Sequence, residues 1–155
     1  MRTAEALVLR PFRPADARFV RALATEAFAE YDGGTGGARV LAMATAPYAH
    51  TIVADVADEP AGFAVVTLDE GHAHLGAIAV ARTSRGVGVG RRLLAAAEDL
   101  AVSLGASTIR LETGEANLAA IELFVRAGYV RTRRIPRYYR TGYDALTYRK
   151  ELSRG

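Results

Sequence analysis

The segment Ile78–Leu94 constrains the fold of this chain more than any other. An apolar stretch typical of a strand gives way to a short loop, and the helix with the clearest apolar periodicity follows. The centre of the segment reads Arg85-Gly86-Val87-Gly88-Val89-Gly90-Arg91. The first N–H groups of a helix have no intrahelical partner and carry the positive end of its dipole, and glycines let a phosphate approach that backbone. The segment therefore predicts an anion site, to which Arg85 and Arg91 add charge.

Two other phosphate-binding motifs fit this segment poorly. The dinucleotide-binding pattern G-x-G-x-x-G would place its third glycine where the chain has Arg91, and several predicted strands precede the loop. A P-loop needs Lys followed by Ser or Thr directly after the glycines, and this chain has Arg91-Arg92-Leu93 there. A tight loop without a ligand is the remaining structural interpretation.

Hydrophobic periodicity predicts a single domain, residues 1–155, of the α/β (α+β) class, with about seven strands in a mixed sheet and about four helices. The expected strands are 6–12, 50–56, 61–69, 72–81, 107–113, 129–135 and 143–152, with a hairpin turn at 57–60. The expected helices are 14–30, with Asp16 as its N-cap, a short one at 38–45, 91–104 and 117–127. The four glycines of residues 31–37 predict a flexible stretch without a regular element.

Composition restricts the classes of protein and partner. The chain has 155 residues, a net charge of +3 and no cysteine, which excludes disulfides, thiolate metal ligands and a cysteine nucleophile. Met1–Arg10 lacks the apolar core of a signal peptide, and no run is long enough to cross a bilayer. We therefore expect a soluble, cytoplasmic protein without a membrane partner. Lys150 is the only lysine, so the excess of arginine fits a coding bias as well as an anionic ligand.

Two separated blocks resemble the GNAT family of N-acetyltransferases. The family's phosphate signature is Arg or Gln, two residues, Gly, one residue, then Gly or Ala, and Arg85, Gly88 and Gly90 match it. Asn117–Tyr129 resembles the second block, an Asn-initiated helix that ends in Gly and an aromatic residue. The resemblance extends over residues 6–152. It implies a GNAT fold and acetyl-CoA as cofactor, whose pantetheine arm would pair with the backbone of Ile78-Ala79-Val80.

The resemblance also implies direct transfer of an acetyl group to an amine in a ternary complex. An alkylammonium has a pKa of about 10.4 and must lose its proton before it attacks, so a base is required. Glu112 lies where bacterial protein-N-terminus acetyltransferases of this family carry a glutamate, and His74 lies where histone-type members carry one. We predict that His74, Ile78 and Val80 share a strand face, and that His74 or Glu112 relays the proton. A backbone N–H near Val80 would bind the oxyanion.

Phe124 departs from the family pattern. Many members place a tyrosine there, whose hydroxyl points at the CoA sulfur as a general acid. Either the thiolate leaves unassisted, or Tyr138, Tyr139 or Tyr143 supplies the proton. The apolar stripe of its helix also allows Phe124 to be a core residue that lines the pantetheine slot. Asn117 would hydrogen-bond the pantetheine or cap its own helix.

The acceptor pocket of the family lies between the first helical region and the last strands, here residues 28–48 and 134–143. We expect Phe28, Tyr31, Tyr138 and Tyr139 to contact the acceptor, which would be a small-molecule amine or a peptide N-terminus. The resemblance is also compatible with a homodimer. An acyl-CoA-binding sensor module with little or no turnover is the alternative function.

Two further patterns indicate other partners only weakly. Arg131, Arg133, Arg134, Arg137 and Arg140 are interleaved with tyrosines, which is typical of nucleic-acid surfaces. Alternation along a strand and loop also gives a solvated face, or arginines that bind a CoA phosphate or an acidic acceptor, so we expect no nucleic acid. Two histidines, His72 and His74, lie two residues apart, but no third ligand follows at a recognisable spacing, so we propose no metal site.

Overall fold

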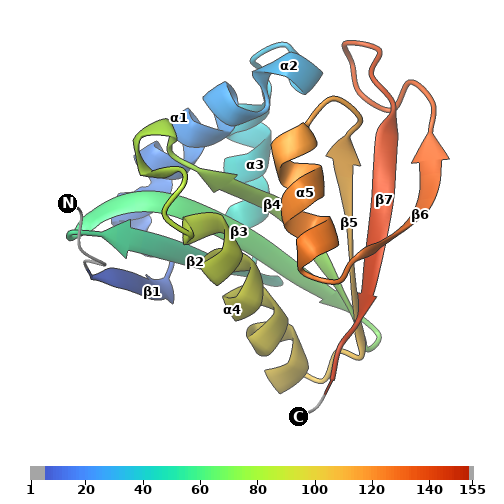
Figure 1. The fold of residues 1–155 in the computed structure, drawn as a ribbon. Coiled ribbons are helices and arrows are strands. Elements are labelled where there is room, and N and C mark those ends of the chain that lie inside the picture. Colours follow the sequence, from blue (N-terminus) through green and yellow to red (C-terminus); the bar gives the residue numbers. More distant parts are fainter. Residues whose placement is uncertain (1–5, 154–155) are drawn as a thin grey trace.

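A seven-stranded sheet runs through the molecule in the order β1-β2-β3-β4-β5-β7-β6 (Figure 1), and the computed structural model describes residues 6–153. The strands are β1 Leu7–Pro11, β2 Ala49–Val56, β3 Glu59–Asp69, β4 His72–Val80, β5 Thr108–Gly114, β6 Val130–Ile135 and β7 Ala145–Glu151. Neighbouring strands are antiparallel, apart from the parallel pair β4 and β5. The mixed sheet of about seven strands expected from the sequence is confirmed.

The parallel pairing of β4 with β5 is short, and this splits the sheet. His72, Ala73 and His74 pair with residues 108–110. Beyond that point β4 continues to pair with β3, and β5 continues to pair with β7. Figure 1 shows the two strands diverging from there, with α5 (Leu118–Arg126) beside the gap. The second half of β4 therefore has an open edge.

Helices cover both faces of the sheet (Figure 1). They are α1 Ala17–Ala27, α2 Ala29–Asp32, α3 Gly36–Ala44, α4 Val89–Ser103 and α5 Leu118–Arg126. On one face, α1 and α3 pack around a core that includes Val20, Val40 and Phe63. On the other face, α4 and α5 bury Leu93 and Phe124 against the sheet. Within residues 6–153, no helix combines the length and apolarity needed to cross a membrane.

A bulge in β4 decides which of its side chains share a face. Two successive residues of β3 pair with residues 75 and 77, so Gly76 is an extra residue in β4. Side chains alternate along a strand, and one extra residue reverses that alternation. Leu75 therefore packs on the α4 face together with Ile78 and Val80, whereas His74 lies on the opposite face. The prediction that His74, Ile78 and Val80 share a face is wrong because of this bulge.

The region predicted as one helix from 14 to 30 is divided. A 3-10 turn at Pro14–Asp16 precedes α1, and the chain breaks at Phe28 before α2 begins, so the described residues contain five α-helices. Nor does Asp16 cap α1 with its side chain. Its carboxylate accepts a hydrogen bond of 2.7 Å from the Arg13 amide, and two of 2.8 and 2.9 Å from the Arg10 guanidinium.

The glycine-rich stretch 31–37 also differs from the prediction. Its first two residues belong to α2, and Gly36 and Gly37 form the buried first turn of α3. A Cβ atom at Gly37 would overlap Thr25 and the backbone of α1, and one at Gly36 would overlap the Asp32 carboxylate. These two glycines thus permit close packing of helices, so their number did not signal flexibility.

Several boundaries shift by a few residues. The β2–β3 turn has two residues, Ala57 and Asp58, with φ of 53° and 68°, so β3 begins at Glu59. A two-residue turn of this kind matches the twist of its flanking strands. Helix α4 begins at Val89, two residues earlier than predicted, and β7 begins at Ala145, two residues later.

Candidate active site

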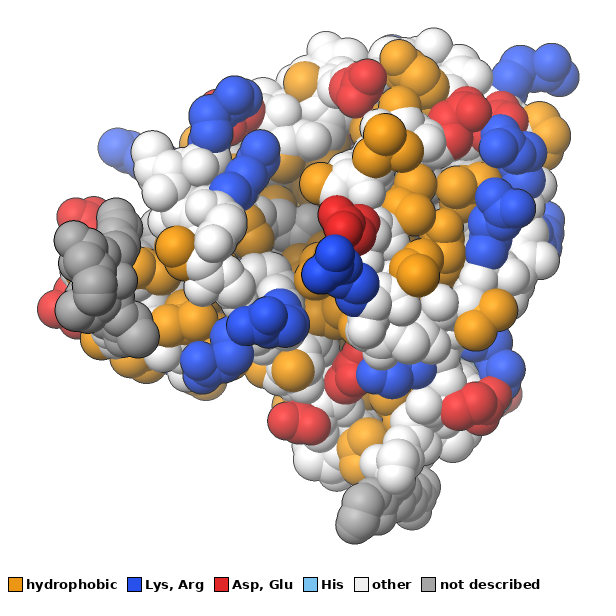
Figure 2. All heavy atoms as spheres, viewed as in Figure 1, with side chains coloured by type: hydrophobic (Ala, Val, Ile, Leu, Met, Phe, Trp, Pro, Cys, Tyr) orange, Lys and Arg blue, Asp and Glu red, His pale blue; other side chains and the backbone are white. Residues whose placement is uncertain are grey.

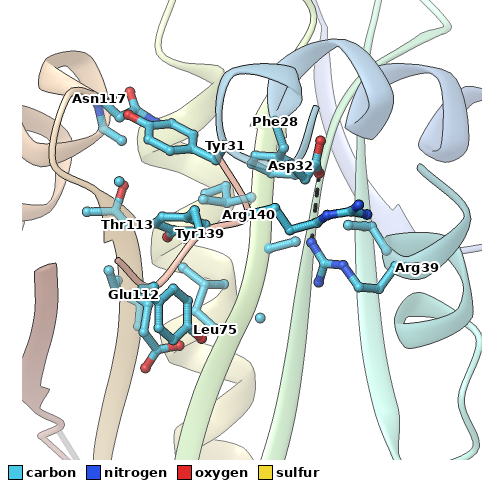
Figure 3. A pocket seen from close by; sticks show the side chains of 18 of the residues that line it. Phe28, Tyr31, Asp32, Arg39, Leu75, Glu112, Thr113, Asn117, Tyr139 and Arg140 are labelled. Carbon is cyan, nitrogen blue, oxygen red and sulfur yellow. Dashed lines mark hydrogen bonds and ion pairs between the residues drawn. The ribbon is translucent and has the colours of Figure 1, made fainter. Parts of the chain in front are cut away.

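A cavity of about 620 Å³ lies where β4 and β5 diverge (Figure 3). Residues from the two diverging strands, among them Gly76 and Glu112, line it. The α5 side contributes Ala120 and Phe124, and the opposite side of the sheet contributes the α1–α3 region and the β6–β7 loop. The cavity therefore crosses the sheet, and two ligands that enter from opposite faces would meet between the strands.

The open edge of β4 offers backbone hydrogen-bonding groups to this cavity. The Ala81 amide donates to the Ala61 carbonyl at 2.7 Å, which makes this residue part of a hydrogen-bonded pair with β3. Such pairs alternate in an antiparallel ladder, so Ala79 also bonds to β3. The N–H and C=O groups of Ile78 and Val80 consequently point toward the open edge. An extended ligand that contains amides could pair with them as an added strand does.

The glycine-rich loop follows the end of β4 and leads into α4. Gly88, at φ 87°, is the residue before the helix. The first amide bonded to the helix backbone is that of Arg92, which donates to the Gly88 carbonyl at 3.0 Å, so the amides just before it point out of the helix end. Arg85 is exposed, and its Nε donates to the Val80 carbonyl at 3.2 Å. Figure 2 shows the surface hollowed between this loop and α5. The loop suits a phosphate-sized anion.

The two residues predicted as alternative bases, His74 and Glu112, are in direct contact. Nε2 of His74 lies 2.7 Å from Oε1 of Glu112, and Arg110 Nη1 donates to Oε2 at 3.0 Å. Glu112 lines the cavity, and His74 is outside the lining with 30% of its side chain exposed. Burial alone would raise the pKa of Glu112, but the hydrogen bond from His74 and the charges of His74 and Arg110 lower it overall. The carboxylate is therefore ionised at neutral pH.

Phe124 is a core residue that also lines the cavity. It is 2% exposed, and its ring centroid lies 5.8 Å from that of Tyr129 and 6.3 Å from that of Tyr148. The Tyr129 hydroxyl donates to Oε2 of Glu98 at 2.8 Å. Burial and the neighbouring Glu98 charge raise the pKa of Tyr129, so this hydroxyl is occupied and stays protonated.

The three tyrosines predicted as alternative acids occupy different places. Tyr138 and Tyr139 line the cavity, whereas the Tyr143 hydroxyl donates to Oε2 of Glu30 at 3.3 Å. Burial raises the pKa of Tyr139, and the neighbouring Tyr138 and Glu112 raise it further. The Tyr139 hydroxyl therefore stays protonated at neutral pH and can donate a hydrogen bond.

An aromatic cluster lines the cavity on the α1–α3 side (Figure 3). The ring of Tyr31 lies 4.8 Å from that of Tyr139, which in turn lies 4.9 Å from that of Tyr138. The position of Tyr31 depends on Gly114, because a Cβ atom there would overlap its ring. The Thr141 hydroxyl donates to the backbone of α2 at 2.8 Å. The β6–β7 loop is thereby tied to α2 over the cavity.

The structure brings many of the predicted site residues together. Eight of them line this cavity: Phe28, Tyr31, Ile78, Glu112, Asn117, Phe124, Tyr138 and Tyr139. Others lie outside the lining: Val80 is on the open edge of β4, Ala79 is paired to β3, residues 85–88 form the loop before α4, and residues 89–91 begin that helix. The Asn117 side chain caps α5, since its Oδ1 accepts from the Ala120 amide at 3.2 Å.

Three charged lining residues were not predicted as site residues: Asp32, Arg39 and Arg140. Asp32 lies in the stretch that was predicted to be irregular. Arg39 is a single charge in a predicted helix, where a solvated position is the usual expectation. Arg140 was grouped with four other arginines of the predicted solvated face. The sequence carries no signal that brings these three side chains together.

The match to a family model agrees with this geometry. The model of the acetyltransferase (GNAT) family matches residues 17–129, and the chain belongs to this family. An uncharacterised N-acetyltransferase of Methanocaldococcus jannaschii is 30% identical over 95 residues, which are 61% of this chain and 61% of that protein. N-alpha-acetyltransferase 30 of Schizosaccharomyces pombe is 36% identical over 75 residues, or 48% and 50% of the two chains. The matches thus span about half to three fifths of these curated relatives.

Solved structures share the fold over nearly the whole chain. Ard1 from Thermoplasma volcanium superposes with a TM-score of 0.85 at 27% identity, over 96% of this chain and 99% of that one. A Salmonella typhimurium protein solved with its cofactor acetyl-CoA superposes with a TM-score of 0.82 over 96% and 95% of the chains. It is 18% identical, and at that identity the likeness shows the fold alone.

Proposed function

We propose that the protein is an acetyl-CoA-dependent N-acetyltransferase that acetylates a primary amine of a small molecule or a protein N-terminus. One observation carries the proposal: the cavity crosses the sheet where β4 and β5 diverge. Glu112 lines it, together with Ile78 of the open edge of β4 and Tyr139 of the aromatic cluster. Membership of the GNAT family and the N-acetyltransferase names of two relatives support it.

The residues present fit acetyl-CoA. The open-edge backbone of Ile78 and Val80 would hold the amides of the pantetheine arm, and Phe124 would form an apolar wall of the slot. The turn before α4 and Arg85 would hold the pyrophosphate. The bound cofactor supplies the acetyl group as a reactive thioester. Open-edge N–H groups of β4 are donors for an oxyanion that develops during transfer.

Glu112, hydrogen-bonded to His74, would accept the proton of the acceptor amine. Glu112 faces the cavity as an anion, so it attracts the ammonium group and accepts its proton directly or through a water molecule. The 2.7 Å hydrogen bond lets His74 orient the Glu112 carboxylate and stabilise its charge from the side away from the cavity. Tyr139 supplies a protonated hydroxyl for the leaving thiolate in place of the family tyrosine.

The test is thiol release from acetyl-CoA in the presence of amine pools: peptides with free N-termini, polyamines, amino acids and aminoglycosides. Acceptor-dependent release that falls by about 100-fold in Glu112→Gln would support the proposal. Release that is absent with every pool, or unchanged in that variant, would contradict the transferase or the role of Glu112 respectively.

A second function is favoured by Phe124. This residue is 2% exposed and has no hydroxyl to protonate a thiolate. An acyl-CoA-binding sensor would keep the cofactor site and need no acid. Tight binding of acetyl-CoA without thiol release in any pool would favour this alternative.

A further inference from the structure

We propose that Arg39 and Arg140 form an anion site at the acceptor side of the cavity, and that the acceptor amine therefore carries a carboxylate. The inference rests on the proposed acetyl transfer and names the chemistry of its acceptor. Both arginines line the cavity, from α3 and from the β6–β7 loop respectively.

The two guanidinium groups meet at one turn. Arg140 Nη1 donates to the Thr35 hydroxyl at 3.4 Å, and Arg39 Nη2 lies 3.9 Å from Oδ2 of Asp32. The Thr35 hydroxyl itself donates to the Asp32 carbonyl at 2.8 Å, so both arginines contact the turn formed by residues 32–35. Figure 3 shows the two side chains on the same side of the cavity as Asp32.

The charge at this turn is not balanced. Asp32 is 7% exposed, and its Oδ2 lies 3.9 Å from Arg39 Nη2, which is longer than a hydrogen bond. Within residues 6–153, Arg140 forms no ion pair. Arg134, in contrast, lies 3.1 Å from Glu115 and 2.7 Å from Asp144. Two arginines thus line the cavity, and among the described residues a single carboxylate, that of Asp32, pairs with one of them, which leaves one positive charge for a ligand.

The cofactor cannot be the source of that anion. The α4 loop that suits the pyrophosphate lies on the α4–α5 side of the sheet, and α3 packs on the opposite side. The acceptor must therefore bring the negative group. Its amine would lie near the Glu112 carboxylate, which repels an anion and attracts an ammonium. A carboxylate on the same molecule would then form charge-assisted hydrogen bonds with the two arginines.

The experiment measures binding by calorimetry in the presence of CoA, so that turnover is not required. The ligands are acetylated products: N-acetyl amino acids, which carry an α-carboxylate, and N-acetyl dipeptide amides with Asp or Glu, which carry one on a side chain. Each is compared with its uncharged amide counterpart. The variants are Arg39→Gln/Arg140→Gln and a control, Arg131→Gln/Arg133→Gln, which removes the same charge from exposed positions of β6.

We expect at least one acid to bind about tenfold more tightly than its amide. Comparison of the N-acetyl amino acids with the N-acetyl dipeptide amides shows whether the site prefers an α-carboxylate or a side-chain carboxylate. The preference should disappear in Arg39→Gln/Arg140→Gln and persist in the control. Equal binding of acids and amides, absent binding of all acids, or an unchanged preference in the pair variant would overturn the inference.

The thiol-release assay separates the two proposals. An acid preference in binding without thiol release from any amine would leave the anion site standing and remove the transferase. Thiol release with neutral amines, together with no acid preference in the binding experiment, would support the transferase and remove the anion site.

Discussion

Nε2 of His74 and Oε1 of Glu112 are 2.7 Å apart and belong to two strands whose pairing ends at the level of His74. His74 is the last residue of β4 that pairs with β5, and Glu112 lies two residues beyond its partner Arg110. The contact thus lies at the point where the two strands begin to diverge. It joins Glu112, which lines the cavity, to His74, which does not. Two residues that the sequence presents as competitors form one unit.

Replacement of His74 by Ala should shift the acid limb of the kcat/KM profile. His74 and Arg110 together lower the pKa of Glu112 against the effect of burial, so loss of either partner raises that pKa. The carboxylate then becomes protonated at a higher pH, and the acid limb moves toward neutrality. Arg110→Gln is the control: it should move the limb in the same direction while keeping most of kcat, because His74 remains. An equal loss of kcat in both variants would show that His74 acts on Glu112 through its charge alone, as Arg110 does, and not by orienting the carboxylate.

Gly88→Ala should weaken CoA binding, whereas Gly105→Ala should not. The two glycines have φ of 87° and 94° at opposite ends of α4, and a left-handed conformation costs an L-residue about 1–2 kcal/mol. Thermal unfolding should show similar destabilisation of both variants. Calorimetric titration with CoA should show a lower affinity for Gly88→Ala alone, since its Cβ and any local shift fall in the anion loop. Equal affinities would place the phosphate elsewhere.

Gly114→Ala should impair use of the acceptor and leave the cofactor site intact. The new Cβ atom would overlap the ring of Tyr31, which packs against Tyr139. Tyr31 must move, and overpacking of this kind costs about 1–3 kcal/mol of stability. KM for the acceptor should rise while Kd for CoA stays constant. A change in CoA affinity of the same size would mean that the aromatic cluster supports both sites.

Arg10→Gln should destabilise the fold, and the effect should fade in acid. Arg10 bonds both Asp16, which is 4% exposed, and Asp55. Removal of one partner from a buried ion pair costs about 3–5 kcal/mol. The hydrogen bond with Arg10 is the main cause that lowers the pKa of Asp16, so this stabilisation is present above the ordinary value of 3.8 and is lost as the pH falls through the lowered pKa.

Denaturant unfolding of wild type and Arg10→Gln at pH 7 and at pH 3 measures this linkage. The difference between their unfolding free energies should be smaller at pH 3. A constant difference would attribute the loss to packing of the arginine stem, since packing does not titrate.

Features of the sequence with a strict period or a local cause predicted the structure well. The apolar repeat of α4 and the glycines before it gave the position of the helix to within two residues, because both follow from backbone geometry within a few residues. Asn117 likewise caps α5, as one of its two predicted roles required, since a cap is formed within three residues.

Features that depend on contacts distant in sequence were missed. Glycines at 36 and 37 lie at a helix–helix contact, and composition cannot distinguish that use from a loop. Arg39 and Arg140 meet across 101 positions, and neither has a neighbour in sequence that marks it. The contact of His74 with Glu112 depends on the bulge in β4, which shows in the pairing register and not in any residue pattern.

The bulge at Gly76 has a consequence for comparing related sequences. A Cβ atom at this position would overlap the end of the Met43 side chain, which would have to move. If β4 ran regularly through Gly76, without a bulge, His74 would turn into the packed interior under α4, and Leu75 would take its place beside Glu112. An alignment or a design that treats β4 as one regular strand therefore inverts the orientation of residues 72–75. It would assign His74 to the hydrophobic core and place Leu75 in contact with Glu112.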